Sequence, residues 1–400
     1  PAKLSQIGAF SSLASLTPIT GLIPYDVNAP LWSDGAKKKR WIAIPNDGTP
    51  NTPAEQIKFS EEGDWEFPIG TVMVKHFDLG TTKVETRFMV KDQNSMWYGM
   101  TYRWNAAQTD ADLLHGRVVD TVAGQTWTFP SQQDCFQCHT STMGNVLGPR
   151  TRQLNGDMLY PKTGRTANQL YTLSQVGYLD TAIAPATLLA YLTSANLADA
   201  TASKEDRARS YLDSNCAHCH NPEEGIAEFD MRLPTNLAYS KLFSAEPRNN
   251  FGIPGVKVIK AGDPSQSLTY LRQNSNDEAM RMPPLGRHAI DTAAVTVISD
   301  WITEVKDPGA PLLPPGVQVW LPFEENSGTV ANDASGNNHA GTLTGGVTWG
   351  PGQTGKSVAL DGKVATGVKI PHSSKLNIGA NNGDFTVTFW VNLQEGANGK

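Results

Sequence analysis

Cysteine and histidine occur together in two copies of one short pattern, and these residues have the clearest potential for chemistry. The chain has 400 residues and four cysteines. All four lie in the two copies, Cys135-Phe-Gln-Cys138-His139 and Cys216-Ala-His-Cys219-His220. A Cys-x-x-Cys-His sequence is the attachment signature of haem c, whose vinyl groups react with the two thiols while the histidine binds the iron. We therefore predict two covalently bound haem c groups, with His139 and His220 as proximal iron ligands.

Two other kinds of site also use paired cysteines. The four thiols could bind one zinc ion in a tetrahedral site, or each pair could act as a thioredoxin-like dithiol. Neither alternative requires a histidine directly after the second cysteine, and both copies have one. The haem interpretation is therefore favoured over both.

The sixth iron ligand of the second haem is expected in the segment Arg281-Met-Pro-Pro-Leu-Gly286. Met282 is the candidate, because the two prolines hold the chain extended there, and Met280 is its competitor. Methionine opposite histidine raises the reduction potential, as suits an electron carrier. His288 is expected to be a polar neighbour of this haem, and His218 to be exposed.

The sixth ligand of the first haem is expected to be His76. This histidine has apolar neighbours in the region that directly precedes the first motif. The alternatives left open are an iron without a distal protein ligand and ligation by His115, Met143 or Met158.

The patterns around these residues predict a multidomain α+β protein. Residues 1–130 are expected to form a β-rich domain, because alternating runs such as 70–77 and 83–90 are separated by turn residues. The basic run Lys37-Lys-Lys-Arg40 is expected to be a solvated surface, with docking of an acidic redox partner as the weaker interpretation.

The middle of the chain is expected to be mainly α-helical around the haems. Residues 131–202 form the first haem segment, and residues 203–306 form the second haem domain. Its first helix is capped by Ser203 and runs into the second motif, and a helix with an apolar stripe over 291–302 closes it.

The last part of the chain returns to β patterns. Residues 307–316 are a stiff Pro/Gly linker, and residues 317–400 predict a β jelly-roll domain with a strand at 385–391. Because the sequence ends soon after that strand, we expect this domain to be incomplete.

Composition narrows the classes of function. No apolar run approaches the roughly 20 residues of a membrane span, so none is predicted. The formal net charge of −6 argues against nucleic acid as a partner. Low charge with many Gly, Pro, Thr and Asn residues favours a periplasmic or extracellular protein.

The region from Leu4 to about Val305 resembles a family of secreted bacterial di-haem c-type cytochromes of uncharacterised function. The segments that carry this resemblance are Val27-Asn-Ala-Pro-Leu-Trp-Ser-Asp-Gly35, Trp65-Glu-Phe-Pro-Ile-Gly-Thr71, Val74-Lys-His-Phe77, Tyr102-Arg-Trp-Asn105, Asp134-Cys-Phe-Gln-Cys-His-Thr140, Thr151-Arg-Gln-Leu-Asn155 and Tyr211-Leu-Asp-Ser-Asn-Cys216. The resemblance implies electron transfer.

Two parts of the chain resemble further families. Residues 203–306 resemble class I cytochrome c in their order of helix, haem motif, methionine loop and helix. Residues 317–400 resemble the start of a laminin-G or concanavalin-type jelly roll, through Asp333-Ala-Ser-Gly-Asn-Asn-His-Ala-Gly341, Leu360-Asp-Gly362 and Phe385-Thr-Val-Thr-Phe-Trp-Val391. The second resemblance implies contact with a glycan or a surface, sometimes with bound calcium.

These inferences predict an extracytoplasmic electron carrier with two haem c groups, and not an enzyme. Its expected partners are redox proteins, further copies of the chain in an oligomer or filament, and a glycan or surface bound by residues 317–400. The alternative is an enzyme of the di-haem peroxidase type, in which one haem iron is open.

Overall fold

The chain folds into two compact units, residues 1–308 and residues 309–400. A computed structural model describes residues 1–49, 51–309, 317–325, 327–335, 337, 339–353, 356–373, 376–377 and 385–392. Most of the expected linker at 307–316 lies outside the described residues. The finer division of the first unit at residues 130 and 202 stays a prediction.

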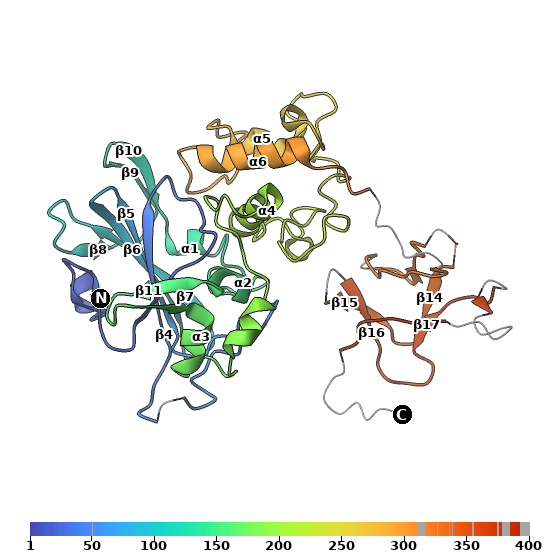
Figure 1. The fold of residues 1–400 in the computed structure, drawn as a ribbon, viewed down its shortest axis with the longest axis horizontal. Helices are drawn as coiled ribbons and strands as arrows, with labels where there is room; N and C mark the ends of the chain where they lie inside the picture. The colour runs from blue at the N-terminus through green and yellow to red at the C-terminus, as the bar shows by residue number, and fades with distance from the viewer. Residues whose placement is uncertain are drawn as a thin grey trace. The chain divides into compact units, whose positions relative to one another are not determined.

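An antiparallel sheet of six strands is the framework of the first unit (Figure 1). The strands pair in chain order, so each is hydrogen-bonded to the next. They are β3 (Ile23–Tyr25), β4 (Lys37–Ala43), β5 (Val72–Leu79), β6 (Thr82–Lys91), β7 (Trp97–Trp104) and β8 (Ala111–Leu113).

The strand register divides the side chains of this sheet between two faces. Neighbours opposite each other in an antiparallel pair share a face, and successive residues alternate. Lys75 lies opposite Arg40 and Arg87, so these three residues share what we call the motif face. His76 is opposite Lys39 and Thr86, on what we call the core face.

Apolar side chains are buried on both faces of the sheet. The core face packs Trp41, Val74, Phe88 and Tyr102 into one buried cluster. Residues of the motif face join a second cluster, which includes Ile42 and Met73. Because both faces are covered, charged side chains on this sheet are partly or fully removed from water.

Hairpins extend the β structure of the first unit. The turn between β9 and β10 has Ala123 and Gly124 at φ values of 49° and 83°, which suits a two-residue turn of type I′. The paired strands are β1 (Phe10–Ser12) with β2 (Thr17–Pro18), β9 (Val118–Val122) with β10 (Gln125–Phe129), and β11 (Asp157–Tyr160) with β12 (Arg165–Asn168).

The helices of the first unit are short. The α-helices are α1 (Gln132–Cys135), α2 (Thr151–Leu154), α3 (Gln169–Gln175), α4 (Lys204–Asn215), α5 (Leu268–Gln273) and α6 (Thr292–Glu304). The 3-10 helices are η1 (Leu4–Gln6), η2 (Pro185–Leu189), η3 (Pro222–Glu224) and η4 (Pro264–Gln266).

Helices α4 and α6 pack against each other (Figure 1). Each begins where a side chain caps it: Ser203 accepts a hydrogen bond from the Asp206 N–H, and Asp291 accepts one from the Ala294 N–H. Their apolar stripes meet in a buried cluster that contains Leu212, Ile298 and Trp301. The capped start at Ser203 therefore carries the chain through α4 into the second motif.

The predicted fold class is wrong for residues 203–306. Between α4 and α6 the structure has only the six-residue α5 and short 3-10 turns, and the remaining backbone there is irregular. Prolines such as Pro222, Pro234 and Pro254 interrupt this region, and a proline removes a helical hydrogen bond and blocks the preceding turn. Irregular segments nevertheless supply buried side chains, including Met231 and Leu242. The first unit is thus β-rich with small helices.

The jelly roll predicted for residues 317–400 is also wrong. The described residues of this unit form a three-stranded sheet and a separate hairpin, and a two-sheet sandwich is absent from them. The strands are β13 (Val330–Ala331), β14 (Gly341–Thr344) and β17 (Gly367–Lys369) in the sheet, and β15 (Thr348–Pro351) with β16 (Lys356–Ala359) in the hairpin.

The strand expected at 385–391 has no regular structure. Its apolar side chains are exposed, with Trp390 at 87%. An alternating sequence forms a strand only where a neighbouring strand binds its backbone and one face is buried, and among the described residues this segment has neither.

None of the helices that the structure describes combines the length and apolar character needed to cross a lipid bilayer.

Candidate functional site

The two Cys-x-x-Cys-His motifs lie side by side in the first unit. The Cys219 thiol lies 4.0 Å from the Gln137 carbonyl oxygen, next to Cys138. The thiols of Cys138 and Cys219 influence each other, which raises the pKa of Cys138 and lowers that of Cys219. The Thr140 hydroxyl, next to His139, donates to the carboxylate of Glu224. All four cysteines are partly exposed free thiols. The fold therefore brings together two motifs that the sequence separates.

Helix α1 holds the first motif against the sheet. Ser131 and Asp134 form a capping box, in which the Ser131 side chain accepts from the Asp134 N–H and the Asp134 carboxylate accepts from the Ser131 N–H. Arg117 donates to the same carboxylate at 2.9 Å and lowers the pKa of Asp134 to about 2. These hydrogen bonds fix the start of α1, and Asp134, which takes part in them, directly precedes Cys135.

Glycine at position 99 lets Cys135 approach β7. A Cβ atom on Gly99 would lie 3.1 Å from the Cys135 Sγ atom. Gly99 is opposite Met89, which is opposite Met73, so Gly99 lies on the motif face. The first motif therefore covers the motif face of the sheet.

The His139 ring is prepared to bind a metal through Nε2. Its Nδ1 atom lies 2.7 Å from the carbonyl oxygen of Asn145. Burial lowers the pKa of His139 to about 4, so the ring is neutral at pH 7 and Nδ1 carries the proton donated to that carbonyl. Metal-binding histidines commonly donate their other ring N–H to a carbonyl in this way, which leaves the Nε2 lone pair for the metal.

The His220 ring is held by stacking. It lies parallel to the Phe229 ring, with centroids 5.1 Å apart and an interplanar angle of 13°. Burial lowers the pKa of His220, so this ring is also neutral at pH 7. Among the described residues, no group hydrogen-bonds its buried Nδ1 atom. Neutral imidazoles beside paired thiols fit the chemistry of haem attachment at both motifs.

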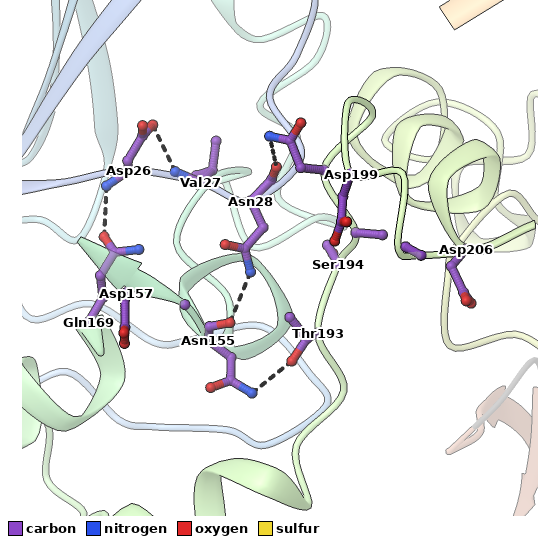
Figure 2. Close-up of a pocket in the computed structure, with 14 residues that line it drawn as sticks. Asp26, Val27, Asn28, Asn155, Asp157, Gln169, Thr193, Ser194, Asp199 and Asp206 are labelled. Atoms are coloured by element: carbon purple, nitrogen blue, oxygen red, sulfur yellow. Dashed lines mark hydrogen bonds between the residues drawn. The ribbon is translucent and has the colours of Figure 1, made fainter. Parts of the chain in front are cut away.

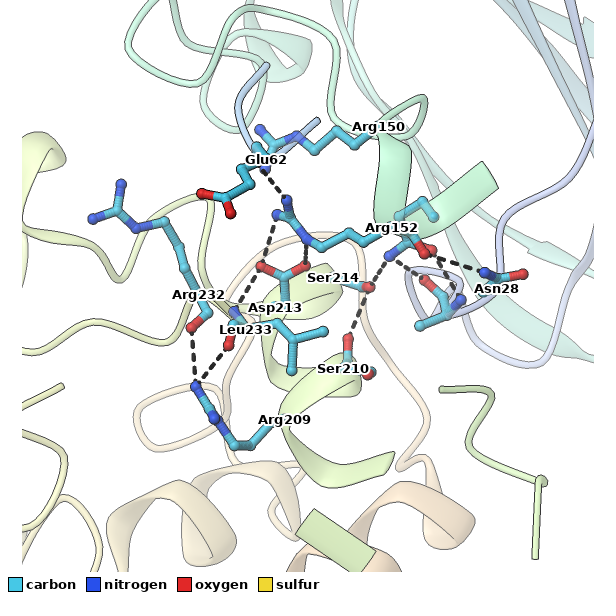
Figure 3. A network of polar contacts seen from close by, with 12 residues as sticks. Asn28, Glu62, Arg150, Arg152, Arg209, Ser210, Asp213, Ser214, Arg232 and Leu233 are labelled. Carbon is cyan, nitrogen blue, oxygen red and sulfur yellow. Dashed lines mark hydrogen bonds and ion pairs between the residues drawn. The ribbon is translucent and has the colours of Figure 1, made fainter. Parts of the chain in front are cut away.

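A buried ion pair joins the element after the first motif to the helix before the second (Figure 3). Arg152 on α2 donates from Nε and one terminal nitrogen to the two carboxylate oxygens of Asp213 on α4, at 2.8 and 3.0 Å. Both side chains are almost fully buried, and the arginine holds the pKa of Asp213 below its usual value against the effect of burial. Asp213 also accepts from the Leu233 N–H at 3.2 Å. We call this pair the α2–α4 clamp.

The segment with Met282 lies beside α5 and is held by two arginines. The Met282 N–H donates to the Arg272 carbonyl at 3.0 Å, and Arg287 donates to the Met282 carbonyl at 2.5 Å. Arg272 also donates to the Met280 carbonyl at 2.7 Å, and its charge acts on His220. The structure thus brings this segment and His220 to the same part of the unit. Ligation by Met282 stays a prediction.

His76 does not lie with the first motif. It is on the core face, whereas Cys135 lies against the motif face. Its side chain is 0% exposed, and its two ring nitrogens lie 2.8 Å from the Thr86 hydroxyl and 2.9 Å from the Asp78 carboxylate. Both nitrogens are therefore occupied, which favours a structural role, and ligation of the first iron by His76 stays a prediction.

The remaining histidines and methionines considered from sequence have varied surroundings. His218, expected to be exposed, is 7% exposed, so that expectation is wrong. His288 contacts the Thr128 hydroxyl at 2.8 Å, and Met143 receives a hydrogen bond from Asn221, the residue after His220, at 3.3 Å. His115 is exposed and Met158 is half-buried in β11.

Several residues of this site were not found from sequence. They are Lys75, Arg87, Gly99, Arg152 and Asp213, each of which comes from an element separate from the motifs. The basic run at residues 37–40 was a sequence signal for β4, the strand paired with the one that carries Lys75. Alternation along β4 buries Arg40 and half-buries Lys38, so the run is not simply a solvated surface.

A polar cleft of about 500 Å³ lies apart from the motifs (Figure 2). Asn28 and Asn155 bridge its walls, with Asn28 donating to the Asn155 carbonyl at 3.1 Å and Asn155 donating to the Thr193 hydroxyl at 2.8 Å. Its carboxylates include Asp199, which accepts from the Thr201 N–H and hydroxyl. These contacts explain the polar lining as local structure.

The chain matches no family model, no curated protein and no solved structure. Within the part of the chain that the structure describes, no three His, Cys, Asp or Glu side chains are grouped to hold a metal ion. Neither finding supports the family of secreted di-haem c-type cytochromes, and the short helices contradict a mainly helical haem region. The expected family membership is therefore wrong, as are the expected relations to class I cytochrome c and to laminin-G or concanavalin domains.

Proposed function

We propose that the chain attaches two haem c groups covalently and transfers electrons outside the cytoplasm. One observation carries the proposal: two complete Cys-x-x-Cys-His motifs lie against each other, each with a neutral histidine. A tetrahedral zinc site would need a grouping of three or four such side chains, which the described residues lack. Haem attachment needs only one histidine at each iron, because the thiols bond to porphyrin carbons.

At each site, some residues of the chain would hold the haem and others would orient its iron ligand. Cys135 and Cys138 would hold one macrocycle and Cys216 and Cys219 the other, while Asn145 orients the His139 ring through its carbonyl oxygen. A bound haem supplies reversible one-electron chemistry at its iron. The contact between Cys138 and Cys219 would keep the two groups close, so that an electron could pass between them.

The expected partners remain part of this proposal. Redox proteins would donate and accept the electrons, further copies of the chain could form an oligomer or filament, and residues 317–400 could contact a glycan or a surface. Calcium in that unit is likewise a proposal. Asp333 there accepts hydrogen bonds from the Trp320, Ser335 and His339 N–H groups, which lowers its pKa to about 2.

The position of His76 favours one alternative function. With its ring nitrogens bonded on the core face, this histidine would not supply the first iron with a sixth ligand. An iron open on one side could bind and activate a small ligand, as in an enzyme of the di-haem peroxidase type.

Two measurements on the full chain test these proposals. Intact-mass analysis after expression in a host that attaches haem c should find two covalent haem groups, and the variant Cys135→Ala/Cys138→Ala should retain one. An absorption spectrum of the reduced protein, with and without carbon monoxide, then reports on the sixth ligands. No change with carbon monoxide supports electron transfer alone, whereas a change at one haem supports the open-iron alternative. A chain without covalent haem would refute both.

A further inference from the structure

Three positively charged side chains lie in one row across the motif face of the sheet. The register places Arg40 on β4, Lys75 on β5 and Arg87 on β6 directly opposite one another. Lys38, two residues before Arg40, shares their face. Like charges directly opposite one another destabilise a sheet. We call these four residues the cation row.

The cation row gathers around one buried ring. The charged groups of Lys38, Lys75 and Arg87 lie 6.0, 5.2 and 4.6 Å from the centroid of the Phe77 ring. Phe77 is 1% exposed. These basic groups are therefore close together at the edge of the protein core. A charge there has a higher free energy than in water, because it is less well solvated.

The carboxylates near the cation row do not balance it. Glu85 pairs with Arg87, and Asp26 pairs with Arg40 but is 61% exposed. Asp291 is close enough to act on Lys38, but it also caps α6 and hydrogen-bonds Tyr211. Lys38 donates to the neutral Leu31 carbonyl at 2.7 Å. Burial and the neighbouring cations lower the pKa of Lys38 to about 7 and that of Lys75 well below its usual value, so both lysines would be fully charged at pH 7 only with a further anion beside them.

The first motif lies over this row. The charge of Arg87 acts on Cys135, Cys138 and His139, and that of Lys75 acts on His139. Cys135 packs against Gly99 on the same face, one strand beyond Arg87. A group attached at these cysteines would therefore reach the cation row.

We propose that the cation row binds the propionate carboxylates of a haem attached at Cys135 and Cys138. Two carboxylates would supply the negative charge that the surrounding side chains lack, and arginine and lysine both bind carboxylates through charge-assisted hydrogen bonds. The proposal rests on the proposed function, because it needs a haem at the first motif.

The test compares neighbouring lysines of β4 and β5 in the full chain. Lys75→Gln and Lys38→Gln each remove one charge from the cation row, and the second variant serves if the first does not fold. Lys39→Gln is the matched control, since Lys39 is next to Lys38 but points to the core face and is half exposed. The readouts are the number of haems by intact mass and the two midpoint potentials by spectroscopic redox titration.

We expect both row variants to keep two haems and to lower one of the two midpoint potentials. A cation beside the propionates favours the reduced iron, so its removal favours the ferric state. Lys39→Gln should leave both potentials unchanged. In the Cys135→Ala/Cys138→Ala chain, which would keep only the second haem, Lys75→Gln should have no effect.

The outcomes separate the two proposals. A wild-type chain without haem would overturn the proposed function and this inference together. Two haems with potentials unaffected by Lys75→Gln and Lys38→Gln would overturn the cation row alone. So would wild-type potentials that depend on the concentration of inorganic phosphate, because the row would then bind free anions.

Discussion

Single residues set how closely the first motif approaches the sheet. Gly99 has no side chain, and a Cβ atom at this position would lie only 3.1 Å from the Cys135 Sγ atom. Its neighbour on the adjacent strand, Met89, lies on the same face and packs beside the core. Glycine therefore occurs where the Cys135 side chain closely approaches the backbone of β7.

Substitution of Gly99 should disturb haem attachment at the first motif. We expect Gly99→Ala to displace Cys135 and to cost about 1–3 kcal/mol of stability, because overpacking forces neighbouring groups to move. Intact mass should then show a larger fraction of chains with one haem than in the wild type. Gly116→Ala is the control, since a Cβ there has nothing within 4 Å. Equal haem content in both variants would contradict the prediction.

Replacement of His76 tests its structural role. We expect His76→Phe to leave the absorption spectrum and the carbon monoxide response unchanged, because the ring faces away from the motif. Thermal unfolding should show a loss of about 1–3 kcal/mol, since Thr86 and Asp78 each lose a hydrogen-bond partner. Met282→Ala is the comparison, and it should open the second iron to carbon monoxide. A new carbon monoxide complex in His76→Phe would restore His76 as a ligand.

At the scale of elements, the α2–α4 clamp determines how the two motifs meet. Arg152 and Asp213 are buried partners on different elements, and the Asn28 side chain also donates to the Arg152 carbonyl at 3.1 Å (Figure 3). Breaking a buried pair by removing one charge leaves the other uncompensated, which typically costs about 3–5 kcal/mol. The clamp thus couples the first haem segment to the helix that leads into the second motif.

Loss of the clamp should be visible in the pH dependence of stability. We expect Asp213→Asn to destabilise the chain by about 3–5 kcal/mol at pH 7. Because the pKa of Asp213 is lowered on folding from 3.8, its stabilising effect is present above that value and lost as the pH falls through the folded pKa. The difference in melting temperature between wild type and variant should therefore shrink below about pH 4. Asp300→Asn, half exposed on α6, should change stability by less than about 1 kcal/mol. A difference that is constant with pH would contradict this account.

Elements with strong local signals could be predicted from sequence, and those that depend on partners could not. The alternation in 70–77 and 83–90 matches β5 and β6, and the cap at Ser203 matches the start of α4. Alternation does not say which face of the sheet meets the motif, so the sequence could not show that His76 lies on the core face. A strand at 385–391 would need a neighbour that no local pattern can supply. The two cysteines and the histidine of each motif lie within five positions of the sequence, whereas Arg152 and Asp213 meet only in the fold.

At the scale of the whole molecule, the contact between the motifs predicts that two bound haems would influence each other. A unit charge gained at one iron changes the energy of charging a nearby iron, and this effect falls with distance. Because Cys138 and Cys219 are close enough to shift each other's pKa, the two attachment sites are neighbours.

Removal of one haem should therefore shift the other. In Cys135→Ala/Cys138→Ala, we expect the second haem to titrate as a single component with a midpoint different from both wild-type components. Redox titration followed by absorbance measures this. Cys216→Ala/Cys219→Ala provides the reciprocal case for the first haem. Midpoints identical to those of the wild type in both variants would mean that the two irons do not interact.

The segment between β3 and β4 also determines when the site can be completed during synthesis. The Trp32 N–H donates to the Asn215 side chain, the Trp32 indole donates to the Ala289 carbonyl, and the Asp34 carboxylate accepts from the His288 and Ala289 N–H groups. Asp34 can therefore form these contacts only after residues more than 250 positions later in the chain have been made. Closing such long loops is slow. These contacts can therefore form only after residue 289 has been made, so haem attachment at the four thiols could precede closure of this part of the fold.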